Sequence, residues 1–318
     1  MNSHFIEIVK YDQRKMEREV INLWNECCQF DLITTEKFRQ FIIFDENFNN
    51  ELCLVAIDID KVVGFIYGYK RQYPYLDKGL ESEKGWIASI FVKKEYRHHG
   101  IAKRLLENIE QKIKEKGAKT IILGANSPHY FFSGLDIDNY PEATSFFEKN
   151  GYNSFEKHYS MGMNLHFFDL SEKSKERKKN FEDFGFQFKV FDYSYSLELL
   201  EFLKTEFGGG WKYNALEAMR KSKAHERIMI VLAPNGTICG CANRAIDDNE
   251  MRFGPIGISK KVRNLRIGTV LLECSMLEMR KRGIYRMFFM TTDENGRRYY
   301  ERVGLKVIRT YYSYKKDL

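Results

Sequence analysis

Two stretches of the chain resemble each other: Ile90-Phe-Val-Lys-Lys-Glu-Tyr-Arg97-His-His-Gly100-Ile-Ala-Lys-Arg-Leu-Leu106 and Ile256-Gly-Ile-Ser-Lys-Lys-Val-Arg263-Asn-Leu-Arg266-Ile-Gly-Thr-Val-Leu-Leu272. When Arg97 is aligned with Arg263, 166 residues further on, the following isoleucine, the two leucines and a later glycine also coincide. Coincidence at this many positions predicts that the chain is a diverged tandem duplication.

The match extends in both directions from this motif. A predicted hairpin precedes each copy, at residues 52–69 and 228–245. Further on, Phe147-Glu-Lys-Asn-Gly-Tyr152 corresponds to Tyr300-Glu-Arg-Val-Gly-Leu305, and the first copy carries extra residues in loops at 70–84 and 127–141. Each copy reads as helix, hairpin, strand, helix, strand, helix, strand, which predicts the α+β fold class.

Composition agrees with a pair of folded domains. At roughly 150 residues per domain, 318 residues correspond to about two, and 43% apolar with 30% charged residues excludes a disordered chain. The net charge of +7 points to an anionic partner, with nucleic acid, a membrane surface and a phosphorylated cofactor as alternatives. Residues 1–17 lack the apolar core of a signal peptide, and no apolar run approaches the ~20 residues of a membrane helix. We therefore expect a cytoplasmic protein without membrane contact.

In both copies an apolar strand leads into a basic loop that opens an amphipathic helix. The free N–H groups and the dipole at a helix N-terminus favour an anion such as phosphate, and glycine lets the backbone approach it closely. Neither the Walker motif nor Gly-x-Gly-x-x-Gly is present. The sequence therefore predicts one phosphate-binding loop in each copy.

The pattern [Arg/Gln]-x-x-Gly-x-[Gly/Ala] after a strand resembles the pyrophosphate loop of the GNAT acetyltransferase superfamily. The segments beginning at Phe147 and Tyr300 resemble the same family's motif near its C-terminal end, and the whole chain is similar to bacterial tandem GNAT proteins. The resemblance implies two GNAT-like domains, each a mixed, mostly antiparallel central sheet flanked by helices. We place an N-terminal domain at 1–168, a linker at 169–185 and a C-terminal domain at 186–318.

The resemblance also implies acetyl-CoA, with its diphosphate on the loop amides and its pantetheine paired against the preceding strand. In the first copy the candidate residues are Ile90, Phe91, Val92, Arg97, His98, His99, Gly100, Ile101 and Ala102. In the second copy they are Ile256, Gly257, Ile258, Arg263, Asn264, Leu265, Arg266, Ile267, Gly268 and Thr269. Arg266 departs from the pattern because it occupies the first glycine position, where its side chain either crowds the pyrophosphate or contacts it.

The second copy carries the better candidates for chemistry. Attack of an amine on a thioester needs a group that accepts the ammonium proton and an acid for the departing thiolate. Tyr300 stands where the family commonly has that acid, whereas the first copy has Phe147 there. Asp293 is a candidate for holding or deprotonating the amine, Glu250 for a water-mediated base, and Trp211 for a substrate lid after three glycines. The first copy is then a cofactor-binding half without catalysis.

Each of these residues also has a simpler interpretation. Tyr300 and Trp211 are also typical of aromatic residues packed in a core. Asp293 is also typical of the N-cap of the helix that follows, and Glu250 of a solvated turn. Cys239 and Cys241 lack the partner spacing of a zinc site, so we expect no metal.

We expect an N-acetyltransferase that acts by direct transfer on a small primary amine, with an amino sugar such as glucosamine as the closest suggestion. A polyamine, an aminoglycoside and a peptide amine are alternative acceptors. A non-catalytic acyl-CoA-binding or sensing protein is the alternative outside enzymes. No RNA-binding signature supports a nucleic-acid partner, and the sequence leaves a homodimer open.

Overall fold

The computed structural model describes residues 6–128 and 130–318, which form two compact units. Unit 1 comprises the residues up to His158 together with Arg309–Leu318, and unit 2 comprises Tyr159–Ile308. Within the described ranges, every helix is too short or too polar to cross a membrane.

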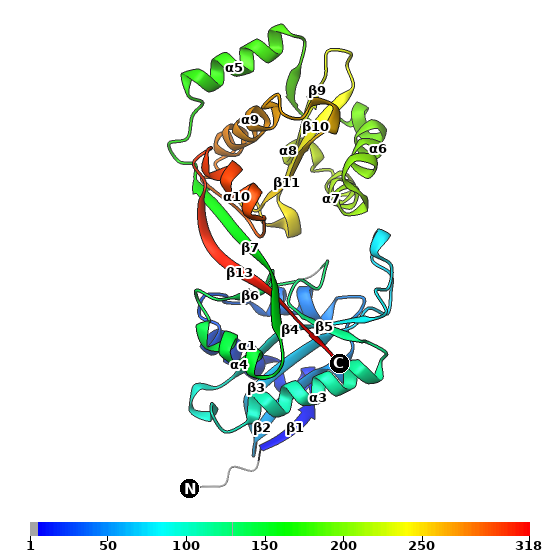
Figure 1. Cartoon of the computed structure of the whole chain (residues 1–318), viewed down its shortest axis with the longest axis vertical. Helices are drawn as coiled ribbons and strands as arrows, with labels where there is room; N and C mark the ends of the chain where they lie inside the picture. Colours follow the sequence, from blue (N-terminus) through cyan, green and yellow to red (C-terminus); the bar gives the residue numbers. More distant parts are fainter. Residues whose placement is uncertain (1–5, 129) are drawn as a thin grey trace. The chain divides into compact units, whose positions relative to one another are not determined.

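Unit 1 is built on a mixed sheet in which β4 and β5 pair in parallel, and the pairs β1–β2, β2–β3, β3–β4 and β5–β13 are antiparallel (Figure 1). Its strands are β1 (Ile6–Lys10), β2 (Cys53–Asp58), β3 (Lys61–Tyr69), β4 (Lys84–Val92), β5 (Thr120–Leu123), β6 (Leu135–Asp136) and parts of β7 (Asn153–Asn164) and β13 (Lys306–Asp317). Its α-helices are α1 (Gln13–Cys27), α2 (Thr35–Phe38), α3 (Ile101–Glu115) and α4 (Pro141–Lys149).

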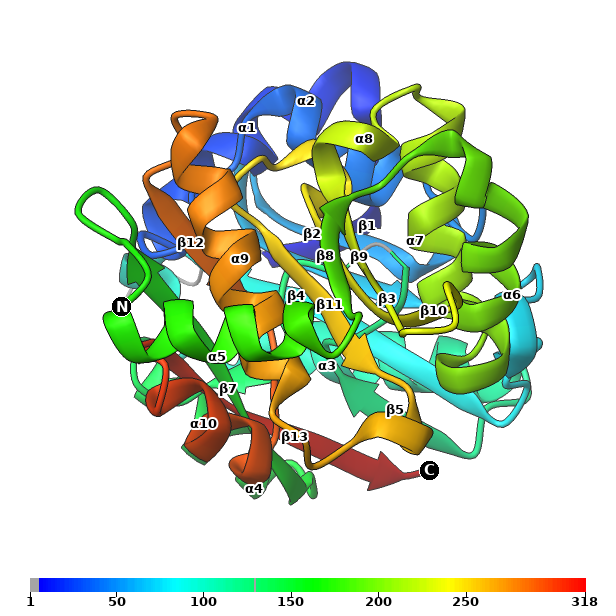
Figure 2. The same ribbon diagram turned by 90° about the horizontal axis from the view of Figure 1, so that it is seen from above.

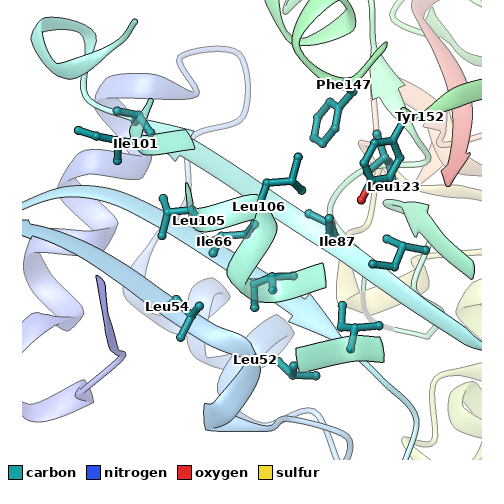
Figure 3. Close-up of a cluster of buried hydrophobic side chains, with 14 of the residues drawn as sticks. Leu52, Leu54, Ile66, Ile87, Ile101, Leu105, Leu106, Leu123, Phe147 and Tyr152 are labelled. Atoms are coloured by element: carbon teal, nitrogen blue, oxygen red, sulfur yellow. The ribbon is translucent and has the colours of Figure 1, made fainter. Parts of the chain in front are cut away.

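Helix α3 covers one face of this sheet because its apolar residues recur every three to four positions. Leu105 and Ile109 are fully buried. Figure 3 shows Leu105 in one cluster with the strand residues Leu54 and Ile66. Truncation of such a leucine to alanine costs about 2–5 kcal/mol. The opposite face packs against α1 and α2 through an aromatic cluster that includes Trp24.

Unit 2 repeats this plan with a four-stranded antiparallel sheet, β11-β10-β9-β8, and a separate pairing of β12 with β7. Its own strands are β8 (Gln187–Val190), β9 (Ile228–Leu232), β10 (Ile238–Arg244), β11 (Phe253–Ile258) and β12 (Arg286–Phe289). Its α-helices are α5 (Glu172–Asp183), α6 (Ser196–Phe207), α7 (Gly209–Arg220), α8 (Ala224–Arg227), α9 (Ile267–Lys281) and α10 (Glu294–Glu301).

Helix α9 lies on one face of the four-stranded sheet, and α6 and α7 lie on the other (Figures 1 and 2). Leu271 and Met276 of α9 are fully buried on the first face, and Leu199 and Leu203 of α6 on the second. Unit 1 thus has a mixed, mostly antiparallel sheet and unit 2 an antiparallel one, each flanked by helices, and the predicted α+β class is confirmed.

The closing strands are exchanged between the two halves of the sequence. Strand β13, at the end of the second copy, pairs with β5 of unit 1 at Lys315↔Ile122. Strand β7, at the end of the first copy, pairs with β12 of unit 2 at Met163↔Met287. The units consequently end at other residues than the predicted boundaries at 168 and 186.

The predicted linker at 169–185 contains the helix α5. Ser171 caps this helix, and the Ser174 hydroxyl donates a hydrogen bond of 2.8 Å to Glu273 of α9. Phe181 packs against the buried cluster of unit 2. The charged residues of the segment are therefore the outer face of a packed helix.

Candidate active site

In each unit two neighbouring strands separate and leave a strand edge open. In unit 1, β4 and β5 pair from Lys84↔Thr120 to Ile87↔Leu123, and the register stops there. In unit 2 the corresponding strands share one isolated parallel bridge, Arg252↔Phe288. Among the described residues, no strand pairs with the second half of β4 or with most of β11 on that side beyond these points.

A β-bulge at the same place in both copies accompanies this separation. The register of β4 against β3 shifts at Ala88, and that of β11 against β10 shifts next to Gly254, 166 residues later. Bulges re-aim a strand and are frequent beside functional sites. The matching positions indicate that the open edge belongs to the duplicated fold itself.

The backbone groups along this edge point into the opening. Lys93 N donates to Val63 O at 2.8 Å, so the backbone N–H and C=O groups of Lys93 point toward β3. Because these groups alternate in direction along a strand, the backbone groups of Ile90 and Val92 point to the opposite side, into the opening. In unit 2, Ser259 N donates to Cys239 O at 2.8 Å, which turns Ile256 and Ile258 the same way. Each edge can therefore pair with an extended ligand that carries amides.

The arginine that the two copies share holds the loop to the end of this strand. Arg97 Nε donates to Val92 O at 3.1 Å, and Arg263 Nε donates to Ile258 O at 3.3 Å. The two bonds join equivalent residues in the two copies. We infer that these guanidinium groups fix the loop geometry in addition to contributing positive charge.

Both loops have the same backbone conformation. His98 and Gly100 have φ values of 65° and 79°, and Asn264 and Arg266 have φ values of 70° and 66°. Helices α3 and α9 then begin without a side-chain cap, so their first N–H groups face outward. A Cβ at Gly100 would meet nothing within 4 Å, which leaves space for an anion above the amides.

Arg266 adopts the left-handed conformation that Gly100 adopts in the other loop. For a residue with a side chain this conformation costs roughly 1–2 kcal/mol. Because the loop shape is retained at that cost, the substitution has not destroyed the second loop. The Arg266 side chain is exposed to solvent.

The structure places all the predicted cofactor residues along these two strand–loop–helix segments. In unit 1, Ile90, Phe91 and Val92 lie on β4, Arg97, His98, His99 and Gly100 form the loop, and Ile101 and Ala102 begin α3. In unit 2, Ile256, Gly257 and Ile258 lie on β11, Arg263, Asn264, Leu265 and Arg266 form the loop, and Ile267, Gly268 and Thr269 begin α9.

Tyr300 lies on α10 in partial burial. Its ring centroid is 4.5 Å from that of Phe289 at the end of β12 and 4.9 Å from that of Tyr299. Burial raises the pKa of Tyr300 well above its usual value, with the neighbouring Tyr299 and Asp293 adding to the effect. The phenol therefore keeps its proton at neutral pH and can donate it.

Asp293 caps α10, as its simpler interpretation predicts. Its Oδ1 accepts a hydrogen bond of 2.7 Å from Gly296 N. The side chain is exposed, and the second carboxylate oxygen is left for a ligand. Because seven residues are almost two full helical turns, Asp293 and Tyr300 lie on the same side of α10, roughly 10 Å apart along its axis.

Glu250 and Trp211 have different surroundings. Glu250 forms ion pairs with Arg244 and, at 3.5 Å, with Arg227, and both arginine side chains are buried. Its carboxylate is thus already engaged by two guanidinium groups, which opposes a role as the base. Trp211 of α7 stacks on Phe207 at 4.2 Å between ring centroids.

The Phe207–Trp211 pair covers β11 at Gly257. A Cβ at Gly257 would lie 2.5 Å from the Phe207 ring and 3.0 Å from Trp211. Glycine at this position thus lets the two rings lie directly against the strand whose edge is open. Trp211 is therefore placed beside the candidate cofactor strand.

Unit 1 has a different side-chain set at the same positions. Phe147 replaces the tyrosine and is buried in the core. Phe91 replaces Gly257, and its ring packs 5.4 Å from that of Trp24. Phe131, from the loop inserted at 127–141, packs 4.9 Å from Trp24. Aromatic side chains thus fill the face of β4 that corresponds to the Phe207–Trp211 face of β11.

Sequence reasoning did not single out Tyr159, which belongs to the first copy in sequence but to unit 2 in space. Tyr159 and Thr292 exchange two backbone hydrogen bonds of 2.9 Å, directly before Asp293. Arg297 of α10 lies 5.4 Å above the Tyr159 ring. The only available signal was an aromatic residue in a predicted closing strand, which does not identify its partner.

Comparison with known proteins places these features in a family. The model of the acetyltransferase (GNAT) family matches residues 18–131 and 196–305, which together make up more than half of the chain. An amino-acid acetyltransferase of Pseudomonas syringae pv. syringae is 35% identical over 85 residues, which are 25% of this chain and 19% of that protein. The chain thus spans only a small part of this curated relative.

Three solved structures resemble the chain over nearly its whole length. A glucosamine N-acetyltransferase region of a fungal multi-domain GH3 β-N-acetylglucosaminidase has a TM-score of 0.80 at 19% identity, with coverage of 99% of this chain and 38% of that one. A GCN5-related N-acetyltransferase from Sphaerobacter thermophilus has a TM-score of 0.72 at 13% identity, with coverage of 98% and 95%. A tandem GNAT protein from the clavulanic acid biosynthesis pathway has a TM-score of 0.66 at 12% identity and covers 98% of each chain.

Proposed function

Because the chain belongs to the GNAT acetyltransferase family, it is an acyltransferase, and we propose that unit 2 transfers an acetyl group from acetyl-CoA to the primary amine of a small molecule. One observation carries this assignment. Unit 2 combines the open edge of β11 and an uncapped phosphate loop with a protonated tyrosine, whereas unit 1 has the buried Phe147 at the tyrosine's position.

The donor set of unit 2 fits acetyl-CoA. The outward backbone groups of Ile256 and Ile258 suit the amides of pantetheine, and the first N–H groups of α9 suit a diphosphate. When bound, acetyl-CoA supplies an activated thioester. Arg266, exposed on the loop, adds a positive charge beside the phosphate position.

Tyr300 serves as the general acid in this proposal. The departing thiolate needs a proton, and a phenol with a raised pKa is protonated throughout the neutral range. Asp293 holds the incoming ammonium group with the carboxylate oxygen that does not cap α10, and the ammonium proton leaves to solvent at this exposed carboxylate before the neutral amine attacks the thioester. We assign no base role to Glu250, since its carboxylate is already neutralised by two arginines.

An amino sugar is the favoured acceptor. The Phe207–Trp211 pair offers an aromatic platform on which a sugar ring can stack, and Asp293 offers a charge for its amine. The fungal structural neighbour includes a glucosamine N-acetyltransferase region. An amino acid is the second candidate, supported by the Pseudomonas relative.

Unit 1 supports a second role, acyl-CoA binding without transfer. It keeps the open edge of β4 and the Gly100 loop, but its acceptor face is filled by Trp24, Phe91 and Phe131. We propose that unit 1 binds the cofactor or serves as a structural half.

The test is thiol release from acetyl-CoA with glucosamine, an amino acid and a polyamine as acceptors. We expect turnover with glucosamine, and a higher KM for the amine in Asp293→Asn, because asparagine keeps the helix cap but removes the charge. The exposed Asp169→Asn is the matched control. Binding of acetyl-CoA without turnover on any amine would favour the non-catalytic alternative.

A further inference from the structure

The loop inserted between β3 and β4 of unit 1 borders a large pocket. This pocket has a volume of about 540 Å³, within the usual range for small-molecule sites. Polar and cationic residues dominate its lining, and the set is Asn49, Lys70, Arg71, Gln72, Leu80, Ser82, Glu83, Lys116, Gly117 and Lys119. Figure 1 shows the inserted loop in cyan after β3.

Hydrogen bonds hold the inserted loop in place. Asn47 Oδ1 accepts from the backbone N–H groups of Gln72 and Tyr73, at 2.7 and 2.8 Å. The buried Arg71 donates to Ser127 O at 2.7 Å and forms a 3.0 Å ion pair with Glu81. The pocket is therefore formed by a fixed wall, and Arg71 is fully engaged in maintaining it.

Lys70 and Lys116 are the two cations of the lining without a carboxylate partner among the described residues. Lys70 is 6% exposed, and its Nζ donates to a single neutral acceptor, Ser82 O, at 2.6 Å. A buried ammonium group with one carbonyl partner is costly unless an anion joins it. Burial accordingly lowers the pKa of Lys70.

Lys116 lies at the C-terminal end of α3, where its charge also favours the helix dipole. The helix dipole accounts for a positive charge at Lys116, but it does not account for the buried ammonium group of Lys70. Lys119 is ion-paired with Glu83 at the rim. The pocket thus keeps an excess of positive charge after its internal pairs are counted.

At the equivalent corner of unit 2 the cations have carboxylate partners. Arg282, which corresponds to Lys116, pairs with Glu278 at 2.9 Å, and Arg227 pairs with Asp248 at 2.9 Å. The copy that carries the insertion is therefore the one in which cations at this corner lack a carboxylate partner among the described residues.

We propose that this pocket of unit 1 binds a small phosphate ester, with Lys70 and Lys116 as the ammonium donors and the Asn49 amide as a neutral donor. A lysine ammonium acts as a point charge that suits phosphate oxygens. The pocket lies at the start of β4, and the Gly100 loop lies beyond the other end of this strand, roughly 25 Å away at 3.3 Å per residue. The site is therefore separate from the proposed cofactor site of unit 1.

The test is calorimetric titration of the full chain with inorganic phosphate at constant ionic strength. We expect saturable binding that is weakened at least tenfold in Lys70→Met and in Lys116→Gln. The exposed Lys173→Gln on α5 is the control for loss of a surface charge. Lys116 is itself exposed, so Lys116→Gln decides the question even where Lys70→Met does not fold.

Two further variants test whether phosphate binds instead at the predicted phosphate loops. Arg97→Gln alters the loop of unit 1, and Arg263→Gln alters the loop of unit 2. Binding that survives both loop variants and is lost in the lysine variants supports the proposal. Binding that is lost in a loop variant, that is indifferent to Lys70 and Lys116, or that never saturates overturns it. The proposed acetyl transfer is measured separately by thiol release, so failure of one proposal leaves the other intact.

Discussion

At one position of the duplicated fold, unit 1 carries Phe91 and unit 2 carries Gly257. The phenylalanine completes an aromatic cluster with Trp24 and Phe131, whereas the glycine leaves the strand backbone in contact with Phe207 and Trp211. Both strands keep the same bulge and the same arginine bond to the loop. Duplication has thus preserved the strand and loop framework in both units, while the side chains that pack on this strand have diverged.

The largest effect on stability is expected in β13, which belongs to the second copy in sequence but pairs with strands of unit 1. Arg309 of β13 pairs in unit 1 with Asp31 at 2.5 Å and with the buried Asp136 at 3.5 Å. Arg309→Met removes their shared partner, and loss of one partner of a buried pair costs about 3–5 kcal/mol. Urea unfolding monitored by amide hydrogen exchange is expected to show unit 1 opening first.

The exposed Arg302→Met is the control for this variant. Equal destabilisation by the two substitutions, or opening confined to unit 2, would show that the exchanged strand contributes nothing specific to unit 1.

A smaller effect is expected from placing the residue of unit 1 into unit 2. Gly257→Phe puts a ring where a Cβ alone would lie 2.5 Å from Phe207. Overpacking of this kind costs about 1–3 kcal/mol, and displacement of the Phe207–Trp211 pair is expected to reduce acetyl transfer. Thermal unfolding and thiol release measure the two consequences.

Gly268→Ala is the control in the same unit. A Cβ at Gly268 would lie 3.4 Å from its nearest neighbour, and the residue is helical, so we expect little loss of stability. Full activity of Gly257→Phe would mean that the aromatic pair does not border the acceptor site.

The smallest effect concerns the loops. Arg266→Gly relieves a left-handed residue and is expected to stabilise the protein by about 1 kcal/mol, while the reverse change, Gly100→Arg, destabilises it by a similar amount. Urea denaturation of both variants checks the sign. Opposite shifts confirm that the loops share one backbone conformation, and a loss of stability in Arg266→Gly contradicts it.

The duplication, the fold class and the loop positions could be predicted because they depend on local patterns. Arg97 and Arg263, with the apolar strands before them and the amphipathic helices after them, identify the same segment twice. The family match over both regions agrees with this prediction.

The exchange of the closing strands could not be predicted, because a strand's pattern does not specify its partner. Strands β7 and β13 have the same length and the same place in their copies, so either pairing is compatible with the sequence. For the same reason the sequence does not indicate that Tyr159 of the first copy lies in unit 2, or that Arg309 of the second copy lies in unit 1. Phe131 lies in an insertion, where no counterpart in the other copy indicates its packing.

The most direct test of unit 2 as the catalytic half is the turnover number of Tyr300→Phe. The account predicts a fall of roughly 10²–10⁴-fold, typical for loss of a general acid, with acetyl-CoA affinity unchanged and with full activity in the exposed Tyr285→Phe control. Wild-type turnover in Tyr300→Phe, together with loss of turnover in Gly100→Trp but not in Gly268→Trp, would contradict it and assign the chemistry to unit 1.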